Sequence, residues 1–119
     1  MTEGRLVLGE SGEEAAARYL TGKGWRILAR RWKGAGREID LVAKRGGVLA
    51  LVEVKTRHPG GLAPASAAVD WRKQRQLAAA GTVAAIRWPN TDEVRFDVIG
   101  VTWNPDGPAV DHLEDAFRP

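Results

Sequence analysis

The stretch Val48–Lys55 reads Val-Leu-Ala-Leu-Val-Glu-Val-Lys, and it constrains the fold more than any other part of the chain. Side chains alternate between the two faces of a strand, so a strand that is apolar on both faces has to be covered on both sides. This stretch therefore predicts a central strand in a sheet with layers on both faces. Glu53 and Lys55, two residues apart, emerge together on one face at its end.

A second strand is predicted at residues 38–43, ahead of a Gly46–Gly47 turn. Two short runs rich in Val, Leu and Ile on either side of a Gly pair are typical of a β-hairpin. Pairing through this turn brings Asp40 beside Glu53, with Lys55 within reach. Because Mg²⁺ is usually held by one or two carboxylates together with water and phosphate, this group indicates a hard-metal site. An interstrand salt bridge at the sheet end is the alternative for any single pair.

Length and composition limit the classes of protein. A chain of 119 residues predicts one domain, residues 1–119. No apolar run reaches the ~18 residues of a membrane span, and the first residues carry no secretory pattern, so we expect a cytoplasmic protein without a membrane partner. Cysteine is absent, which excludes disulfides and thiolate metal sites, and only two histidines are present, which disfavours zinc.

The charge is unevenly distributed along the chain. Residues 1–88 contain sixteen Lys and Arg against eight acids, whereas residues 89–119 contain two against seven. Phosphate contacts supply most of the non-specific affinity for nucleic acids, so a basic surface near carboxylates predicts a polyanionic partner. A solvated charged face is the alternative. The cations cluster at Arg26, Arg30, Arg31, Lys33, Arg37, Lys44 and Arg45, and again at Arg72, Lys73 and Arg75.

The first predicted helix begins at Ser11, which forms a capping box with Glu14, and ends near Gly24. Glu13 recurs with Ala16, Ala17 and Leu20 at the spacing of one helical face, so it lies on the stripe that should pack against the sheet. A carboxylate there is unfavourable unless a cation meets it. We expect Glu13 to point into the same site as Asp40 and Glu53; a first-turn contact with the helix dipole is the alternative.

The remaining pattern predicts a helix, three strands, a second helix and one or two further strands, which is the order αβββαβ. Lys73 falls on the apolar stripe of the second helix, from which a long side chain can reach solvent. His58 is expected in an exposed loop, and Trp103 and Phe117 in core or edge packing. The expected elements are an edge strand at 25–31, a hairpin loop at 32–37, a turn-rich stretch at 56–65, a helix from Ser66 or Asp70 that Gly81 ends or merely weakens before 82–86, a strand at 94–101 and a returning strand at 109–113.

An acid on the first helix, an acid on the second strand and Glu-x-Lys on the third resemble the PD-(D/E)XK, or restriction-endonuclease-like, nucleases, which include the archaeal Holliday-junction resolvases. More closely, nearly the whole chain is similar to the small bacterial YraN family. This resemblance implies an α/β fold with a restriction-endonuclease-like αβββαβ core and a mixed central sheet flanked by helices. It rests on Gly12–Glu13, Ala16, Tyr19 and Leu20, Glu38–Leu41, Val52–Lys55 with Arg57, Ala68–Val69 and Lys73, Arg95–Val98, His112–Leu113 and Ala116–Phe117.

The resemblance also implies roles for individual residues. Asp40 stands at the superfamily's metal-binding aspartate, and Glu53 at its second acid. Lys55 stands at the catalytic lysine, and Glu13 at the extra helix acid of resolvase-like members, where it would support the metal or a second ion. The backbone carbonyl that follows the second acid, here that of Val54, is a further metal ligand in the superfamily. Mg²⁺ or Mn²⁺ is the implied cofactor.

Two positions depart from the superfamily pattern. Ile39 precedes the aspartate where many members have proline, a variation that YraN-like chains share, and Arg37 stands where glycine is more usual. Neither change removes an acid or the lysine. We expect Arg37, Arg57 and Lys73 to contact nucleic acid.

Three hypotheses follow for the function. The first is a metal-dependent phosphodiesterase that cleaves DNA more readily than RNA, including branched or repair intermediates, for which a homodimer would supply two active sites. The second is a nucleic-acid-binding module without chemistry, which recruits a protein partner through its acidic C-terminal segment. The third is a purely structural cluster of ion pairs.

Overall fold

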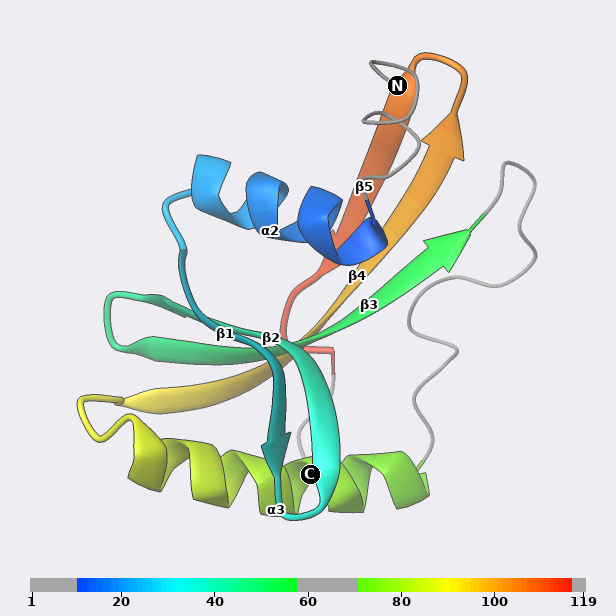
Figure 1. Ribbon diagram of the computed structural model, residues 1–119. Helices are drawn as coiled ribbons and strands as arrows, with labels where there is room; N and C mark the ends of the chain where they lie inside the picture. The colour runs from blue at the N-terminus through cyan, green and yellow to red at the C-terminus, as the bar shows by residue number, and fades with distance from the viewer. Residues whose placement is uncertain (1–10, 58–70, 117–119) are drawn as a thin grey trace.

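The computed structural model describes residues 11–57 and 71–116, which form one mixed sheet between two helices (Figure 1). This α/β arrangement is consistent with a restriction-endonuclease-like core, and it confirms the predicted fold class. None of the described helices is long and apolar enough to cross a membrane. The elements are α2 (Gly12–Gly22), β1 (Arg26–Gly34), β2 (Arg37–Arg45), β3 (Val48–Arg57), α3 (Trp71–Arg87), β4 (Glu93–Asn104) and β5 (Gly107–Leu113).

The sheet has the strand order β1-β2-β3-β4-β5, so β3 lies at its centre as the apolar stretch predicts. Hairpins make the β1–β2, β2–β3 and β4–β5 pairs antiparallel, whereas β3 and β4 are parallel. Parallel neighbours need a crossover connection, and α3 is part of it. The other helix, α2, covers the opposite face (Figure 1).

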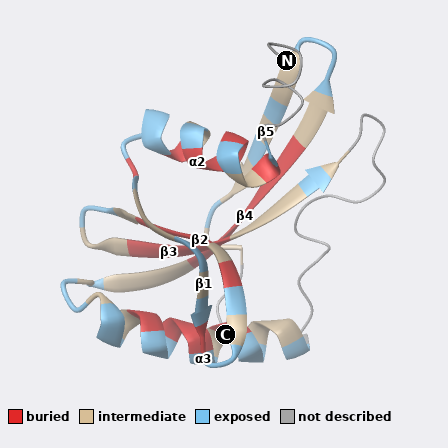
Figure 2. Ribbon diagram, viewed as in Figure 1, coloured by how far each residue is buried: buried red, intermediate tan, exposed pale blue. Residues whose placement is uncertain are grey.

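The core consists of two apolar layers, one on each face of the sheet (Figure 2). Ala50 and Val52 of β3 pack toward α2, while Leu49 and Leu51 pack toward α3. All four residues of β3 are at most 2% exposed, as expected for a strand that is apolar on both faces.

The start of α2 lies against the C-terminal end of β3. Ser11 is the N-cap, and its hydroxyl and the Glu14 carboxylate each accept a hydrogen bond from the other's backbone N–H, so the predicted capping box is confirmed. Gly12 has no space for a side chain, because a Cβ there would lie 2.0 Å from Oγ1 of Thr56. This close approach brings Glu13 over the end of β3.

Several element boundaries differ from the prediction. The edge strand β1 continues to Gly34, so the expected loop shrinks to Ala35 and Gly36, with φ of 54° and 77°. Two consecutive positive φ values are the geometry of a tight two-residue hairpin. Gly81 does not end α3, which continues to Arg87, and a Cβ at Gly81 would lie 2.9 Å from the Phe96 ring. The predicted features at His58, Ser66, Ala68, Val69, Asp70 and Phe117 lie outside the described residues.

A buried polar network joins β4, β5 and α2. Asp97 is 2% exposed, and its carboxylate accepts hydrogen bonds from the Arg95 guanidinium (2.9 Å twice) and the Asp115 backbone N–H (3.0 Å), and pairs with Nε2 of His112 (2.8 Å). The other His112 nitrogen lies 3.2 Å from the Tyr19 hydroxyl. Burial by itself raises the pKa of Asp97, but hydrogen bonds from His112, Arg95 and Asp115 outweigh it and lower the pKa below its ordinary value.

We expect Asp97→Asn to lower the free energy of unfolding by about 3 kcal/mol at pH 7, because it leaves the Arg95 side chain, 13% exposed, without its main counter-ion. A lowered native pKa means that this stabilisation is present above the unfolded pKa of about 3.9 and is lost as the pH falls through the native pKa. Urea unfolding at a series of pH values measures both effects. Asp106→Asn, in the exposed β4–β5 turn, is the control; equal losses in the two variants would contradict the prediction.

Candidate metal and phosphate site

The candidate site lies where β2 and β3 separate. The two strands pair from Arg45 with Val48 as far as Leu41 with Val52. Beyond that pair, the β2 residues continue on β1 alone and the β3 residues on β4 alone. Asp40 and Glu53 are the first residues past the last pair, one on each strand. Pairing through the Gly46–Gly47 turn therefore brings the two acids together as predicted.

Asp40 occupies an irregular point of β2. Ile39 packs in the α3 layer and Leu41 in the α2 layer, although residues two apart share a face in a regular strand. Oδ2 of Asp40 accepts the backbone N–H of Val54 at 2.7 Å. Because β2 no longer pairs with β3 at this point, the carboxylate takes the place of a backbone carbonyl and satisfies a donor that the separation would leave without one.

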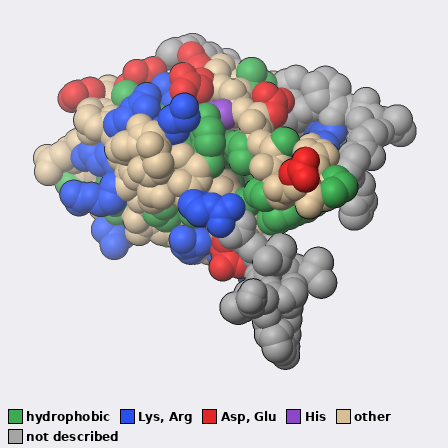
Figure 3. All heavy atoms as spheres, turned by 90° about the horizontal axis from the view of Figure 1, so that it is seen from above, with side chains coloured by type: hydrophobic (Ala, Val, Ile, Leu, Met, Phe, Trp, Pro, Cys, Tyr) green, Lys and Arg blue, Asp and Glu red, His purple; other side chains and the backbone are tan. Residues whose placement is uncertain are grey.

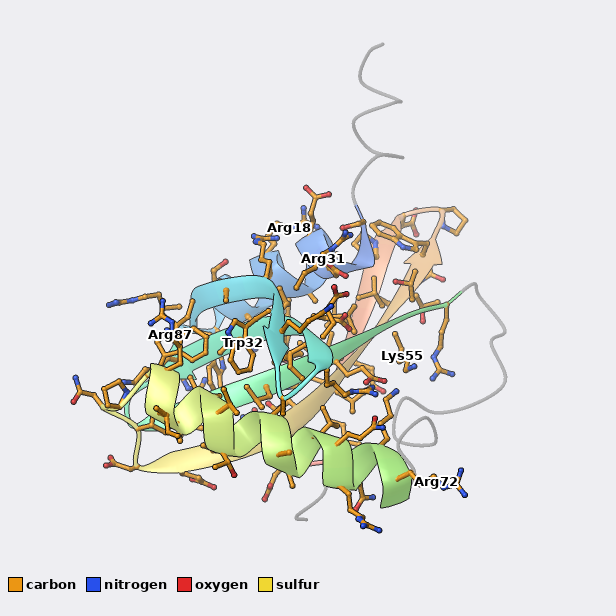
Figure 4. All side chains as sticks on the ribbon, turned by 60° about the horizontal axis from the view of Figure 1, so that its bottom comes forward. Arg18, Arg31, Trp32, Lys55, Arg72 and Arg87 are labelled. Atoms are coloured by element: carbon orange, nitrogen blue, oxygen red, sulfur yellow. The ribbon has the colours of Figure 1, made fainter. Side chains whose placement is uncertain are left out.

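Glu53 is surrounded by three cations. Its Oε2 lies 2.5 Å from Nζ of Lys73 and 3.0 Å from Nζ of Lys55, and its Oε1 lies 3.5 Å from Arg37. The Glu53 side chain is 15% exposed. Lys55 lies on the α3 side of β3 (Figure 4), and Lys73 comes from the first turn of α3. The sheet and one helix therefore converge on a single carboxylate.

The pKa values of the two carboxylates, Asp40 and Glu53, are shifted in opposite directions. Burial raises the pKa of Asp40, and the negative charges of Glu13, Glu53 and Glu38 raise it further, against the hydrogen bond from Val54. Burial also raises the pKa of Glu53, but hydrogen bonds and charge from Lys73 and Lys55 outweigh it and lower the pKa. Neighbouring acids whose environments drive their pKa values apart are a feature of catalytic sites.

Glu13 reaches the edge of this site through Arg31. Its Oε1 accepts a hydrogen bond from Nε of Arg31 at 3.2 Å, and Figure 4 shows Arg31 beside α2. The Glu13 hydrogen bond and charge raise the pKa of Arg31, and Glu38 and Asp40 add to the effect. Glu13 is thus close enough to influence Asp40, and its direct partner is an arginine.

Arg31 and Gln76 contact residues of the site, but the sequence marks Arg31 only as part of a basic cluster and does not single out Gln76. With Trp32 opposite Ile39 and Arg30 opposite Leu41, Arg31 lies across the hairpin from Asp40. Counting back from a two-residue Ala35–Gly36 turn would have found it. Gln76 accepts a hydrogen bond from Arg37 at 2.9 Å, and no sequence signal marks it.

Two of the three residues expected to contact nucleic acid lie against Glu53. Arg37 and Lys73 both hold Glu53, and their side chains are 26% and 19% exposed. Arg57 is the last residue of β3 and continues the alternation of Glu53 and Lys55. Figure 3, seen from above the view of Figure 1, shows further Lys and Arg side chains on that face, with Asp and Glu side chains among them.

The acids line a small pocket whose chemistry fits a hard divalent cation. Its polar lining consists of Glu38, Asp40, Glu53 and Asp97, and Leu77 and Phe96 are among its apolar residues. Across residues 11–57 and 71–116, no three acidic, histidine or cysteine side chains come close enough together to hold a metal ion. Two carboxylates are nonetheless enough for Mg²⁺, which retains several waters. The oxygen donors of Asp40 and Glu53 therefore fit the predicted cofactor.

The mixed five-stranded sheet between two helices is an α/β fold that is consistent with a restriction-endonuclease-like core. The chain belongs to the family described as "Uncharacterised protein family UPF0102", whose model matches residues 12–101. This is the YraN-type family that the sequence resembles.

Similar proteins occur in distant bacteria. The chain is 41% identical to UPF0102 protein GSU0650 of Geobacter sulfurreducens, over 94% of this chain and 89% of that one. It is 45% identical to a UPF0102 protein of Symbiobacterium thermophilum, over 84% and 86% of the two chains. A Rhodococcus opacus relative is 38% identical over 94% and 97%. The match thus covers nearly the full length of each.

We expect Asp40→Asn to raise the thermal midpoint at pH 7, because it removes a carboxylate whose ionised form is disfavoured by burial and by Glu13, Glu53 and Glu38. Because the pKa of Asp40 is higher in the native state than in the unfolded state, this group stabilises the fold at pH values below its unfolded pKa. That stabilisation is lost as the pH rises through the native pKa. The difference between wild type and variant should therefore vanish toward pH 3. Thermal melts across pH test this; a variant less stable at pH 7 would contradict it.

Proposed function

We propose that this protein is a metal-dependent phosphodiesterase that acts on DNA in the cytoplasm. The observation that carries the proposal is the meeting of Asp40, Glu53 and Lys55 at the point where β2 and β3 separate. Two carboxylates beside a cation, one with a raised and one with a lowered pKa, suit the binding of a divalent ion next to a proton-transferring group.

The Asp40 and Glu53 carboxylates would hold Mg²⁺ or Mn²⁺, with the Val54 carbonyl as a third ligand by analogy with the superfamily. When bound, the ion supplies Lewis acidity toward the phosphodiester and the attacking water. Glu13, whose charge acts on Asp40 and whose carboxylate is bound by Arg31, would support the metal or a second ion.

Lys55 would orient the attacking water and offset charge on the phosphate. The Lys55 side chain is 32% exposed, and its ammonium lies 3.0 Å from Oε2 of Glu53, so Lys55 is both positioned and accessible. Arg37, Arg57 and Lys73 would contact the flanking phosphates. Cleavage of a four-way junction would require two such sites, which a homodimer would supply.

The second candidate is a nucleic-acid-binding module that keeps the scaffold without the chemistry and recruits a protein partner through its acidic C-terminal segment. It is favoured by the small number of acids in the site and by the three cations that already neutralise Glu53. Calorimetric titration of the pure protein with Mg²⁺ and Mn²⁺ separates the candidates, because only the enzyme needs a specific divalent site.

We expect Asp40→Ala, Glu53→Ala and Lys55→Ala each to reduce DNA cleavage by about 10²- to 10⁴-fold while the circular dichroism spectrum stays that of the wild type. The assay uses single-stranded, duplex, flapped and four-way DNA with each metal, and RNA for comparison. Asp106→Asn, remote from the site, should cleave normally.

Two results would refute the mechanism. One is full Mn²⁺-dependent cleavage by pure Asp40→Ala protein. The other is salt-sensitive binding of every substrate with no cleavage by the wild type under any metal, which would favour the binding module.

A further inference from the structure

Glu53 has more counter-ions than its own charge requires. Lys55 and Lys73 share Oε2, and Arg37 faces Oε1. Three positive groups around one carboxylate repel one another, and the excess is balanced when two of the pocket's other acids, Asp40 and Glu38, are included; the remaining acid of the pocket, Asp97, is paired with Arg95. With the Glu13–Arg31 pair neutral in itself, the described part of the site is close to neutral.

Entry of a divalent cation would disturb this balance. An ion on Asp40 and Glu53 would add two positive charges within a few ångströms of three existing ones. Such a site has to release a cation from Glu53 or receive an anion. A nucleic-acid phosphodiester carries the required charge, and lysine and arginine donors bind phosphate oxygens as well as they bind carboxylates.

The packing of the three cations indicates which of them can exchange. Lys55 is on the same strand as Glu53, two residues away, so its ammonium remains beside the carboxylate. Lys73 belongs to α3 and reaches Glu53 across the gap between helix and sheet, through a flexible four-carbon chain. Among the described residues, Nε of Arg37 is buried without an acceptor, so this guanidinium also lacks a complete set of partners.

We propose that Lys73, assisted by Arg37, is an exchangeable counter-ion of Glu53 that moves from the carboxylate to the nucleic-acid phosphate when a divalent cation binds. Lys73 is thus a positioning residue that couples metal binding to nucleic-acid binding. In the protein alone, Lys73 competes with the metal for Glu53. In the complex with nucleic acid, it binds the phosphate. This inference rests on the proposed function and specifies how its site is regulated.

The first test is calorimetric titration of the full chain with Mg²⁺ and Mn²⁺ in the absence of nucleic acid. Lys73→Gln should bind the metal about tenfold more tightly than the wild type, because one competing positive charge is gone. Lys73→Arg, which keeps the charge, should stay near the wild type. Arg72→Gln is the matched control: it removes a charge from the same turn of α3, where Arg72 points away from the sheet (Figure 4). Thermal melts verify that each variant is folded.

The second test measures binding of a nuclease-resistant phosphorothioate DNA duplex with and without Mg²⁺. Metal should tighten DNA binding by the wild type, and by linkage that enhancement should shrink in Lys73→Gln by the same factor of about ten. With Mg²⁺ present, the salt dependence of DNA binding by Lys73→Gln should be lower than that of the wild type by about one phosphate contact. Without Mg²⁺, the two proteins should show nearly the same salt dependence.

The outcomes separate this inference from the proposed function. Tighter metal binding by Lys73→Gln, but not by Arg72→Gln or Lys73→Arg, supports it. A wild type that binds metal together with a Lys73→Gln variant that binds it equally or more weakly overturns the inference and leaves the proposed function standing. A wild type that binds no divalent metal overturns both. Arg37→Gln gives a second variant in which the same direction of change is expected.

Discussion

The hydrogen bond from the Val54 backbone N–H to Asp40 is the interaction on which the site depends. Strands that separate inside a sheet leave backbone donors without acceptors, and a buried donor without a partner is unfavourable by about 1–3 kcal/mol. Asp40 resolves this problem with its side chain and is thereby held at the point where the strands part. A residue that the fold needs for its own hydrogen bonding is thus also one of the two carboxylates of the proposed metal site. The separation of β2 from β3 also provides the space in which Glu53 and its cations lie.

The electrostatics of the site follow from unequal distribution of counter-ions. Glu53 has three basic partners, while the described contacts of Asp40 are one backbone N–H and the fields of neighbouring charges. The two acids therefore differ in proton affinity although both are partly buried. The Glu53 carboxylate is well neutralised and the Asp40 carboxylate is poorly neutralised, so a positive charge near Asp40 would be favourable. This asymmetry is the physical reason to expect a cation there.

Much of this arrangement could be predicted because it depends on local patterns. The stretch from Val48, which is apolar on both faces, predicted that β3 lies at the centre of the sheet. The Gly46–Gly47 turn predicted the register that brings Asp40 to Glu53. Ser11 and Glu14 marked the start of α2. The partners of the site were less predictable, because they depend on tertiary contacts between distant segments. Lys73 lies twenty residues from Glu53, and its apolar-stripe position indicated burial without naming a partner. Arg31 could not be distinguished from the other residues of its basic cluster, because its position opposite Asp40 depends on the length of the hairpin turn between β1 and β2.

The Asp97 network gives the fold a particular dependence on its last strand. Tyr19 of α2 meets His112 of β5 across 93 residues of chain, and the same histidine is bound to Asp97 of β4. Contacts of such long sequence separation form late, because a large loop has to close before they contribute. During synthesis, α2 is made first but cannot complete its packing until β5 has left the ribosome. A truncated chain that ends before β5 would leave both the Tyr19 hydroxyl and the Asp97 carboxylate without His112, so an error in the last strand would be felt in the first helix.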